Sequence, residues 1–280
     1  MNVTVLRESW RPYPLAWIHR AEARFFAEEL RRAGYAVRLV QFRYDSVSDL
    51  PPGLLVLRVS DPVMLVAVQT LTRAGLPFLG PSAAVMARCY DKYEAYRIAT
   101  AHGVDCPATA LASESSMASM PMMLKPRRGS DSIGVRLLKD GRIPAHARTD
   151  RYIAQQYVRG VELTVAVFRG RAGMPLRIFL PEATPYSFFR KYLRPTPRAP
   201  LADIALAERV RRTALEIARS FEIDWAARID LIHEVETDRL RFLECDAAPL
   251  VGANSAFAAS LQAAGIGRTE QLRMLLSEKR

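Results

Sequence analysis

Residues 226–255 have the sequence AARIDLIHEVETDRLRFLECDAAPLVGANS. A polar turn at 236–239 separates two apolar runs, which predicts an antiparallel hairpin. Side chains two apart on a strand point to the same face, so Glu244 and Asp246 should project together. Antiparallel pairing would bring Asp230 across from them. The stretch therefore predicts three carboxylates on one face of a sheet.

Three carboxylates on one face repel each other unless a cation or an arginine compensates their charge. Hard oxygen ligands in that number suit Mg²⁺, which also takes phosphate oxygens and water. An exposed acidic hairpin face is the alternative, but Glu244 and Asp246 lie within the mostly apolar string 241–249. We therefore expect Asp230, Glu244 and Asp246 to bind Mg²⁺.

A second informative stretch, at 125–138, reads KPRRGSDSIGVRLL. Lys125 ends an apolar strand and precedes a turn of basic and small residues, whose backbone N–H groups can cover a polyphosphate. Lys92, on the helix predicted before this stretch, could reach the same phosphates. Taken alone, each signal is weak, and a solvated lysine or an ordinary hairpin turn explains it better.

The order of these features is more specific than any one of them. An α/β lobe, a helix with a lysine, a strand with a lysine, a strand with a glutamate, a long helix, and RxD and ExD strands follow each other. This order resembles the ATP-grasp ligases, and within them the D-alanine–D-alanine ligase branch, from residue 80 to about residue 275. The best-matched stretches are 125–138, YIAQQYVRGVELTVAVF (152–168), FFRKYL (188–193), RID (228–230) and ECDAAPLVGANS (244–255).

The resemblance implies an ATP-grasp architecture of mixed α/β and α+β class. An N-terminal parallel α/β lobe would span residues 1–80, followed by a central subdomain with a phosphate-covering loop at 81–158. A C-terminal subdomain with the metal and acceptor site would span 159–280. The last two lobes would sandwich ATP. Alternating strands and helices in the first lobe predict its parallel sheet independently.

Hydrophobic periodicity and glycine or proline punctuation predict the individual elements. Residues 185–200 hold four prolines with aromatic and basic side chains, which predicts a loop. Besides the two strands of the hairpin, the predicted helices are 16–33, 61–74, 81–103, 202–221, 255–264 and 269–277, and the predicted strands are 2–6, 36–42, 54–59, 77–79, 122–125, 134–138, 152–158, 162–168 and 174–181.

The nucleotide contacts follow from the resemblance. Two lysines would hold the α- and β-phosphates, the loop 129–134 would close over them, residues 155–158 would line the adenine, and a glutamate would take the ribose. A tyrosine and a lysine would sit on a mobile loop that shields the reacting phosphoryl group. The implied residues are Lys92, Lys125, Gly129, Ser130, Gln155, Gln156, Tyr157, Val158, Glu162 and Tyr192, with Ser132 and Lys191 in catalytic positions.

The resemblance also implies the reaction. A carboxylate would attack the γ-phosphorus of Mg-ATP to give an acyl phosphate and ADP, and an amine would then attack the acyl carbon, releasing phosphate. Arg228 would stabilise the oxyanion of the tetrahedral intermediate, and Ser255 would meet a substrate carboxylate. The expected partners are small amino acids or peptides, and a homodimer is implied by the resemblance alone.

Several positions depart from the family pattern. Asp246 stands where the family has an asparagine, Asp131 where it has a serine, Gln155 where it has an acidic residue, and Leu250 where it has a glycine. The family's N-terminal glycine/serine/glutamate loop, which reads the first D-alanine, has no counterpart, and RESWRPY stands at 7–13 instead.

These departures favour substrates other than two D-alanines: another amino acid or a small peptide, or a ring-closing reaction in specialised metabolism. Arg7, Arg11 and Arg58 could receive an anionic group of such a substrate, although a purely structural loop fits at least equally well.

The composition of the chain limits the other classes of function that it could have. The net charge of +11 comes from dispersed arginines, which fits an anionic small molecule better than nucleic acid. Three scattered cysteines predict neither disulfides nor zinc, and the absence of a signal peptide or a long apolar run predicts a cytoplasmic protein without membrane contact. A small-molecule kinase on the same fold and a non-catalytic nucleotide-binding protein remain open.

Overall fold

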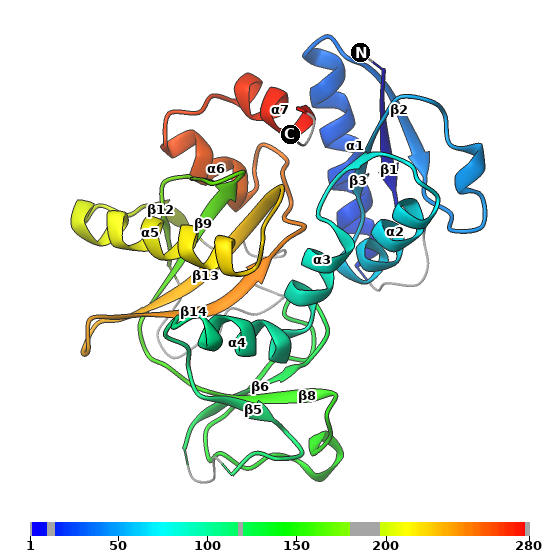
Figure 1. The fold of residues 1–280 in the computed structure, drawn as a ribbon. Helices are drawn as coiled ribbons and strands as arrows, with labels where there is room; N and C mark the ends of the chain where they lie inside the picture. The colour runs from blue at the N-terminus through cyan, green and yellow to red at the C-terminus, as the bar shows by residue number, and fades with distance from the viewer. Residues whose placement is uncertain (1, 10–14, 117–119, 180–196, 278–280) are drawn as a thin grey trace.

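The computed structural model describes residues 2–9, 15–116, 120–179 and 197–277, which build three sheets in succession along the chain (Figure 1). The mixed α/β and α+β class expected from the sequence is confirmed, with one parallel sheet followed by two antiparallel ones. No helix among these residues combines the length and apolar character that crossing a membrane requires.

The first sheet is parallel and covered by a helix on each face. Its strands run in the order β2-β1-β3-β4. Val3 and Val5 of β1 share a core with one helix, α1, whereas Leu6 shares a core with the other, α2, as the two-residue period of a strand requires. The elements are β1 (Asn2–Arg7), α1 (Ala16–Arg32), β2 (Ala36–Gln41), η1 (Val47–Asp49), β3 (Leu54–Arg58), α2 (Asp61–Arg73) and β4 (Phe78–Leu79).

The predicted helix at 81–103 is wrong as a single element. The structure has α3 (Ala83–Tyr90) and α4 (Lys92–Ala101), separated by Asp91 in an extended conformation with φ −91° and ψ 102°. The Asp91 carboxylate accepts hydrogen bonds from the backbone N–H groups of the first turn of α4, so it is an N-cap. It also pairs with Arg127 and Arg128, which attaches the start of α4 to the stretch after Lys125.

The second sheet is a small antiparallel one in the order β5-β8-β6-β7. Its apolar side packs around Met122, Leu124 and Ala154. The three-residue strand at its edge, β5, was not predicted from the sequence. The elements are β5 (Thr109–Leu111), β6 (Met122–Pro126), β7 (Arg136–Leu138), η2 (Ala145–Ala147) and β8 (Tyr152–Gln156).

The third sheet carries the predicted hairpin at one edge, where β14 is the terminal strand. Its strand order is β12-β11-β9-β13-β14, with a further short strand paired to β9. The predicted helix 202–221 is α5, and the last two predicted helices are also present. The elements are β9 (Val161–Phe168), β10 (Arg171–Ala172), β11 (Leu176–Ile178), β12 (Arg198–Pro200), α5 (Ile204–Ser220), β13 (Ala226–Glu234), β14 (Arg239–Asp246), α6 (Ala256–Ala263) and α7 (Arg268–Leu276).

The two faces of this sheet differ in chemistry because side chains alternate along its strands. On one face, Val165 of β9 and Ile229 of β13 pack with α5 in a continuous apolar core. The opposite face carries Glu162, Thr164 and Asp230, which line cavities. The alternation therefore directs the polar side chains of β9 and β13 away from the core.

Helix α1 connects the first lobe to the end of the chain. Its buried residues Phe26 and Leu30 share one core with Phe257 of α6 and Leu275 of α7. Figure 1 shows α1 beside β1 and β3, with α6 and α7 close to the end of the third sheet. The other side of α1 lines a cavity together with Arg228 and Asp230 of β13.

Candidate active site

A cavity of about 600 Å³ lies between the second and third sheets, and we call it the nucleotide cavity. It is lined from below by β6 and β8 and from above by β13 and β14. It brings together every residue in the described part of the chain that was predicted to contact nucleotide: Lys92, Lys125, Gly129, Ser130, Gln155, Gln156, Tyr157, Val158 and Glu162, together with Ser132, Asp230 and Glu244. The predicted residues Lys191 and Tyr192 lie outside the described residues.

The two lysines enter this cavity from different elements. Lys125 Nζ donates to Gln155 Oε1 at 2.6 Å, across the β6–β8 pair. Lys92 Nζ donates to the Gly129 carbonyl at 2.5 Å and lies 3.5 Å from Glu244 Oε1. Burial lowers the pKa of Lys125, although the charge of Glu244 opposes that shift. An anion bound beside the ammonium group of Lys125 would offset the cost of burying its charge.

The loop after Lys125 has an unusual backbone. Asp131 and Ser132 both have φ of 58°, in the left-handed region that non-glycine residues seldom adopt. Asp131 is buried, and its Oδ2 lies 3.3 Å from His19 Nε2 of α1. The first lobe therefore contacts the loop directly and supports its conformation.

The hairpin register confirms the predicted arrangement of carboxylates. Asp230 pairs with Glu244 and Arg228 pairs with Asp246, so all four side chains project from the same face. The register shifts next to Asp230, where Leu243 is the extra residue of a β-bulge. Leu243 and Glu244 consequently both line the nucleotide cavity.

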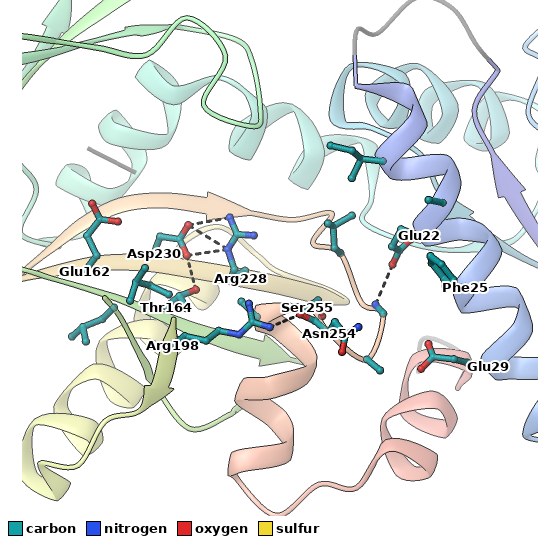
Figure 2. A pocket seen from close by; sticks show the side chains of 18 of the residues that line it. Glu22, Phe25, Glu29, Glu162, Thr164, Arg198, Arg228, Asp230, Asn254 and Ser255 are labelled. Atoms are coloured by element: carbon teal, nitrogen blue, oxygen red, sulfur yellow. Dashed lines mark hydrogen bonds and ion pairs between the residues drawn. The ribbon is translucent and has the colours of Figure 1, made fainter. Parts of the chain in front are cut away.

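The carboxylates are held as ion pairs. Arg228 Nε lies 3.0 Å from Asp230 Oδ1, and Arg228 Nη1 lies 3.2 Å from Asp246 Oδ2. Thr164 Oγ1 donates to Asp230 Oδ1 at 2.7 Å (Figure 2). Burial acts to lower the pKa of Arg228, but the charges of Asp230 and Asp246 outweigh it and raise that pKa well above its usual value. Arg228 is therefore a fixed cation in the site.

A Mg²⁺ site is not assembled in this arrangement. Within the described ranges, no three or more His, Cys, Asp or Glu side chains are grouped so that they could hold a metal ion. The donor chemistry nevertheless fits, because Asp230 and Glu244 face one cavity with carboxylate oxygens, the ligands that Mg²⁺ prefers. Arg228 and Lys92 supply the compensating positive charge in the structure. Magnesium at these residues stays a prediction.

A second cavity, of about 690 Å³, lies between α1, β13 and the segment after β14 (Figure 2). We call it the acceptor cavity. Arg228 and Asp230 line it at one end, and Ser255 lines it from the start of α6. The Ser255 hydroxyl accepts a hydrogen bond from Ala258 N at 3.0 Å, so it caps α6 while facing the cavity.

Several residues of the acceptor cavity were not predicted. Trp17 and Phe25 line it from α1, Thr164 from β9 and Arg198 from β12. Thr164 could have been found from its spacing, because it lies two residues after Glu162 on the same strand face. Trp17 and Phe25 could also have been found, because helical periodicity places both on the side of α1 opposite its buried residues.

The expectation that Arg58 receives a substrate anion is corrected. Arg58 is only 2% exposed, lines neither cavity, and donates to Glu22 Oε2 at 3.1 Å and to the Pro249 carbonyl at 2.7 Å. Arg7 also lies outside both cavities, and burial together with Arg20 and Arg24 lowers its pKa. Arg7 and Arg58 are therefore not placed to meet a substrate in either cavity, and Arg11 lies outside the described residues.

The two cavities share part of their wall. Glu162, Ile178, Asp230 and Leu243 line both of them. Burial, together with the charge of Asp230, raises the pKa of Glu162 to about 7. Two compartments that meet at Asp230 could hold two reactants with their reacting ends adjacent.

The chain is similar to known proteins, and these similarities agree with the site described above. Residues 89–178 match the ATP-grasp domain family. The chain is 24% identical to a D-alanine–D-alanine ligase of Aquifex aeolicus, over 80% of this chain and 82% of that protein, and 28% identical to one of Acidiphilium cryptum, over 82% of each. The structure of the Bacillus anthracis D-alanine–D-alanine ligase complexed with ATP superposes with a TM-score of 0.79, at 18% identity, over 98% of this chain and 96% of that one.

Proposed function

Because the chain is an ATP-grasp ligase that resembles the D-alanine–D-alanine ligase branch, we propose that it joins a carboxylate to an amine through an acyl phosphate, releasing ADP and phosphate. The observation that carries this proposal is the meeting of two cavities at Asp230. One cavity has lysines and a turn for phosphates, and the other has a buried arginine and room for a second reactant.

In this proposal, ATP occupies the nucleotide cavity. Lys125 and Lys92 contact its phosphates, and the loop with Ser130 and Ser132 covers them. Gln155 to Val158 line the adenine, and Glu162 accepts hydrogen bonds from the ribose. Mg²⁺ would be held by Asp230, Glu244 and Asp246 and would supply screening of the triphosphate charge. Lys191 and Tyr192, which lie outside the described residues, keep their predicted shielding roles.

In the acceptor cavity, Arg228 is the central charged group. Its guanidinium is fixed by Asp230 and Asp246, so it is oriented before a substrate arrives. Such a preorganised cation stabilises negative charge that develops on the acyl oxygen when the amine attacks. Ser255 lies across the same cavity and could donate its hydroxyl hydrogen to a substrate carboxylate.

We further propose substrates other than a pair of D-alanines. Leu250 lines the acceptor cavity at a position where the resembled branch has glycine, and the glycine/serine/glutamate loop has no counterpart at 7–13. A ring-closing reaction within one substrate remains part of the proposal. The three sheets support a division into lobes at 1–80, 81–158 and 159–280.

A time course with Mg-ATP and a panel of D- and L-amino acids and dipeptides tests the reaction. Products are followed by ³¹P NMR and mass spectrometry, with and without hydroxylamine. We expect ADP, phosphate and either a new amide or a trapped hydroxamate. AMP and pyrophosphate would contradict the mechanism, and a stable phosphate ester would instead identify a kinase.

Two variants and a control connect the reaction to the site. Asp230→Asn and Arg228→Met should each lower turnover by about 100-fold or more, because one removes a proposed metal ligand and the other a preorganised donor. Asp45→Asn, on an exposed loop of the first lobe, should leave turnover unchanged. Full activity of Asp230→Asn would contradict the metal assignment.

A further inference from the structure

The acceptor cavity has an aromatic wall on α1. Trp17, Ala21 and Phe25 line it at four-residue spacing, so they form one stripe along the helix. Trp17 is 50% exposed and Phe25 is 60% exposed. The opposite side of α1, with Ala23, Phe26 and Leu30, forms the buried core, so these two rings are additional to the packing of the helix.

Other elements also contribute apolar side chains to the cavity. Ile178 of β11 and Leu250, in the segment after β14, line it together with the aromatic stripe. Arg228, Asp230 and Thr164 line one end of the cavity, and Arg198, Asn254 and Ser255 line it between that end and α1 (Figure 2). A ligand whose polar groups meet these side chains would still place an apolar side chain on Trp17 and Phe25.

The acidic residues of the α1 wall already have partners. Glu22 accepts hydrogen bonds from Arg58, Glu29 pairs with Arg268 at 2.5 Å, and Glu28 lies 3.9 Å from Arg32. A cationic side chain of a substrate would have to compete with these arginines. The wall thus favours an uncharged, apolar group over a basic one.

The size of the cavity fits the same conclusion. A volume of about 690 Å³ lies within the range of roughly 300–1,000 Å³ that drug-sized ligands occupy. A methyl side chain would leave most of the aromatic wall exposed to water. An aromatic side chain would itself bury about 150–250 Å², which makes contact with the rings favourable.

We propose that the substrate in the acceptor cavity is an amino acid, or a dipeptide residue, with an aromatic or large aliphatic side chain. Its reacting end lies near Arg228 and Asp230, and its side chain packs on Trp17 and Phe25. This inference rests on the proposed ligase function and specifies its substrate class. Trp17 and Phe25 are specificity-determining residues in this assignment and take no part in the chemistry.

Calorimetric titration tests the inference without requiring turnover. D- and L-forms of phenylalanine, leucine and alanine are titrated into the protein with saturating Mg-ADP. The wild type should bind the better phenylalanine enantiomer about tenfold or more tightly than alanine. In the Trp17→Ala/Phe25→Ala double variant, this preference should fall to near parity while alanine binding is retained.

Two controls separate packing on the stripe from general damage. Tyr44→Ala removes an aromatic ring that is 72% exposed and lines neither cavity, so it should bind like the wild type. Trp17→Phe/Phe25→Leu keeps an apolar stripe and should restore most of the preference. Circular dichroism spectra of all variants check that α1 is folded.

The outcomes distinguish this inference from the proposed function. Equal binding of phenylalanine and alanine by the wild type, no binding of any panel member, or a preference unchanged in the double variant overturns the aromatic-wall assignment. Ligation of small amino acids with no such preference would leave the ligase intact and the inference wrong. Stripe-dependent phenylalanine binding without any hydroxamate would support the cavity assignment and count against the ligase reaction.

Discussion

Glu162 has a carboxyl group whose charge depends on pH in the physiological range. Burial and the nearby Asp230 raise its pKa to about 7, despite the opposing charge of Lys125. Since its folded-state pKa lies above its unfolded value, ionising it costs stability, and that cost grows as pH rises from about 4.5 to about 7. A ribose hydroxyl donating to the ionised carboxylate would offset part of this cost.

ATP affinity should therefore increase as pH rises from 6 to 8. The reason is that only the ionised Glu162 accepts hydrogen bonds from both ribose hydroxyls without a competing proton. Calorimetry across this range, comparing wild type with Glu162→Gln, measures the effect, because the variant retains the titration of the nucleotide itself. Glu236→Gln, in the exposed hairpin turn, is the matched control. Parallel pH profiles for wild type and Glu162→Gln would contradict the ribose assignment.

At the residue scale, side chains on regular strands were the predictable ones. Glu244 and Asp246 could be placed on one face by strand periodicity, but their pairing with Asp230 depends on the bulge at Leu243, because the regular register would set Leu243 opposite Asp230. Arg58 could not be placed, because its partners Glu22 and Pro249 are 36 and 191 positions away and come together only in the tertiary structure. Local pattern carries no information on such pairs.

At the scale of elements, Glu22 connects α1 to the segment after β14. Its Oε1 accepts hydrogen bonds from Val251 N at 3.0 Å and Gly252 N at 3.1 Å, and both of its oxygens accept from Arg58. The pair is buried, with side-chain exposures of 10% for Glu22 and 2% for Arg58. Removing the carboxylate would leave an uncompensated buried guanidinium and two unsatisfied N–H groups.

Glu22→Ala should lower the free energy of unfolding by about 3–5 kcal/mol, the usual cost of breaking one side of a buried ion pair. Urea unfolding followed by circular dichroism measures it. Glu28→Ala, two turns away and only weakly paired with Arg32, should change stability by less than about 0.5 kcal/mol. Equal losses for the two variants would mean that the Glu22 contacts contribute nothing specific.

The contact between His19 and Asp131 joins α1 to the phosphate loop. Burial acts to lower the pKa of His19, but the hydrogen bond and charge of Asp131, with Asp61 and Glu8, outweigh it and raise that pKa. A raised histidine pKa stabilises the fold fully below the unfolded value of 6.5, and the contribution is lost as pH rises through the folded value.

The difference in free energy of unfolding between wild type and His19→Gln should therefore shrink when the pH of a urea titration is raised from 6 to 9. His146→Gln removes an exposed histidine of η2 and should show no pH-dependent gap. Hydrogen exchange of the loop at 129–134 provides a local readout, since loss of the charged contact should speed exchange there. A gap that widens with pH would contradict the assigned sign.

Helices with a long, regular hydrophobic period could be predicted from the sequence, but breaks within such a period could not. The period of α1 fixed its ends to within one residue, helped by Gly34, whose φ of 88° ends the helix. The break at Asp91 was missed because the sequence on both sides is helical in character. Its cause is tertiary: the Asp91 carboxylate binds Arg127 and caps α4 at once.

At the scale of the whole molecule, ligand binding should be visible as stability. Saturation with Mg-ATP at 100 times its dissociation constant should add about 2.7 kcal/mol to the free energy of unfolding, because the unfolded chain has no site. Lys125→Met should lose most of this increment, and Lys139→Met, on the exposed turn after β7, should keep it. Thermal unfolding with and without nucleotide measures the difference. Equal increments for both variants would contradict the phosphate role of Lys125.

The architecture was accessible from sequence because the order of features, rather than any single motif, carried it. Alternating strands and helices predicted the parallel sheet, and the succession of lysine, glutamate and RxD strands predicted the two that follow. The acceptor cavity was not accessible, because its walls come from α1, β11, β13 and the segment after β14, which are distant in sequence.

The wall common to the nucleotide and acceptor cavities makes them one thermodynamic unit. Leu243 and Asp230 contact whatever occupies either side, so an occupant that shifts these groups alters the other compartment. Binding linkage is reciprocal: the factor by which ATP changes affinity for the amine must equal the factor by which the amine changes affinity for ATP. Substrate choice and nucleotide affinity in this protein cannot be tuned independently at those positions.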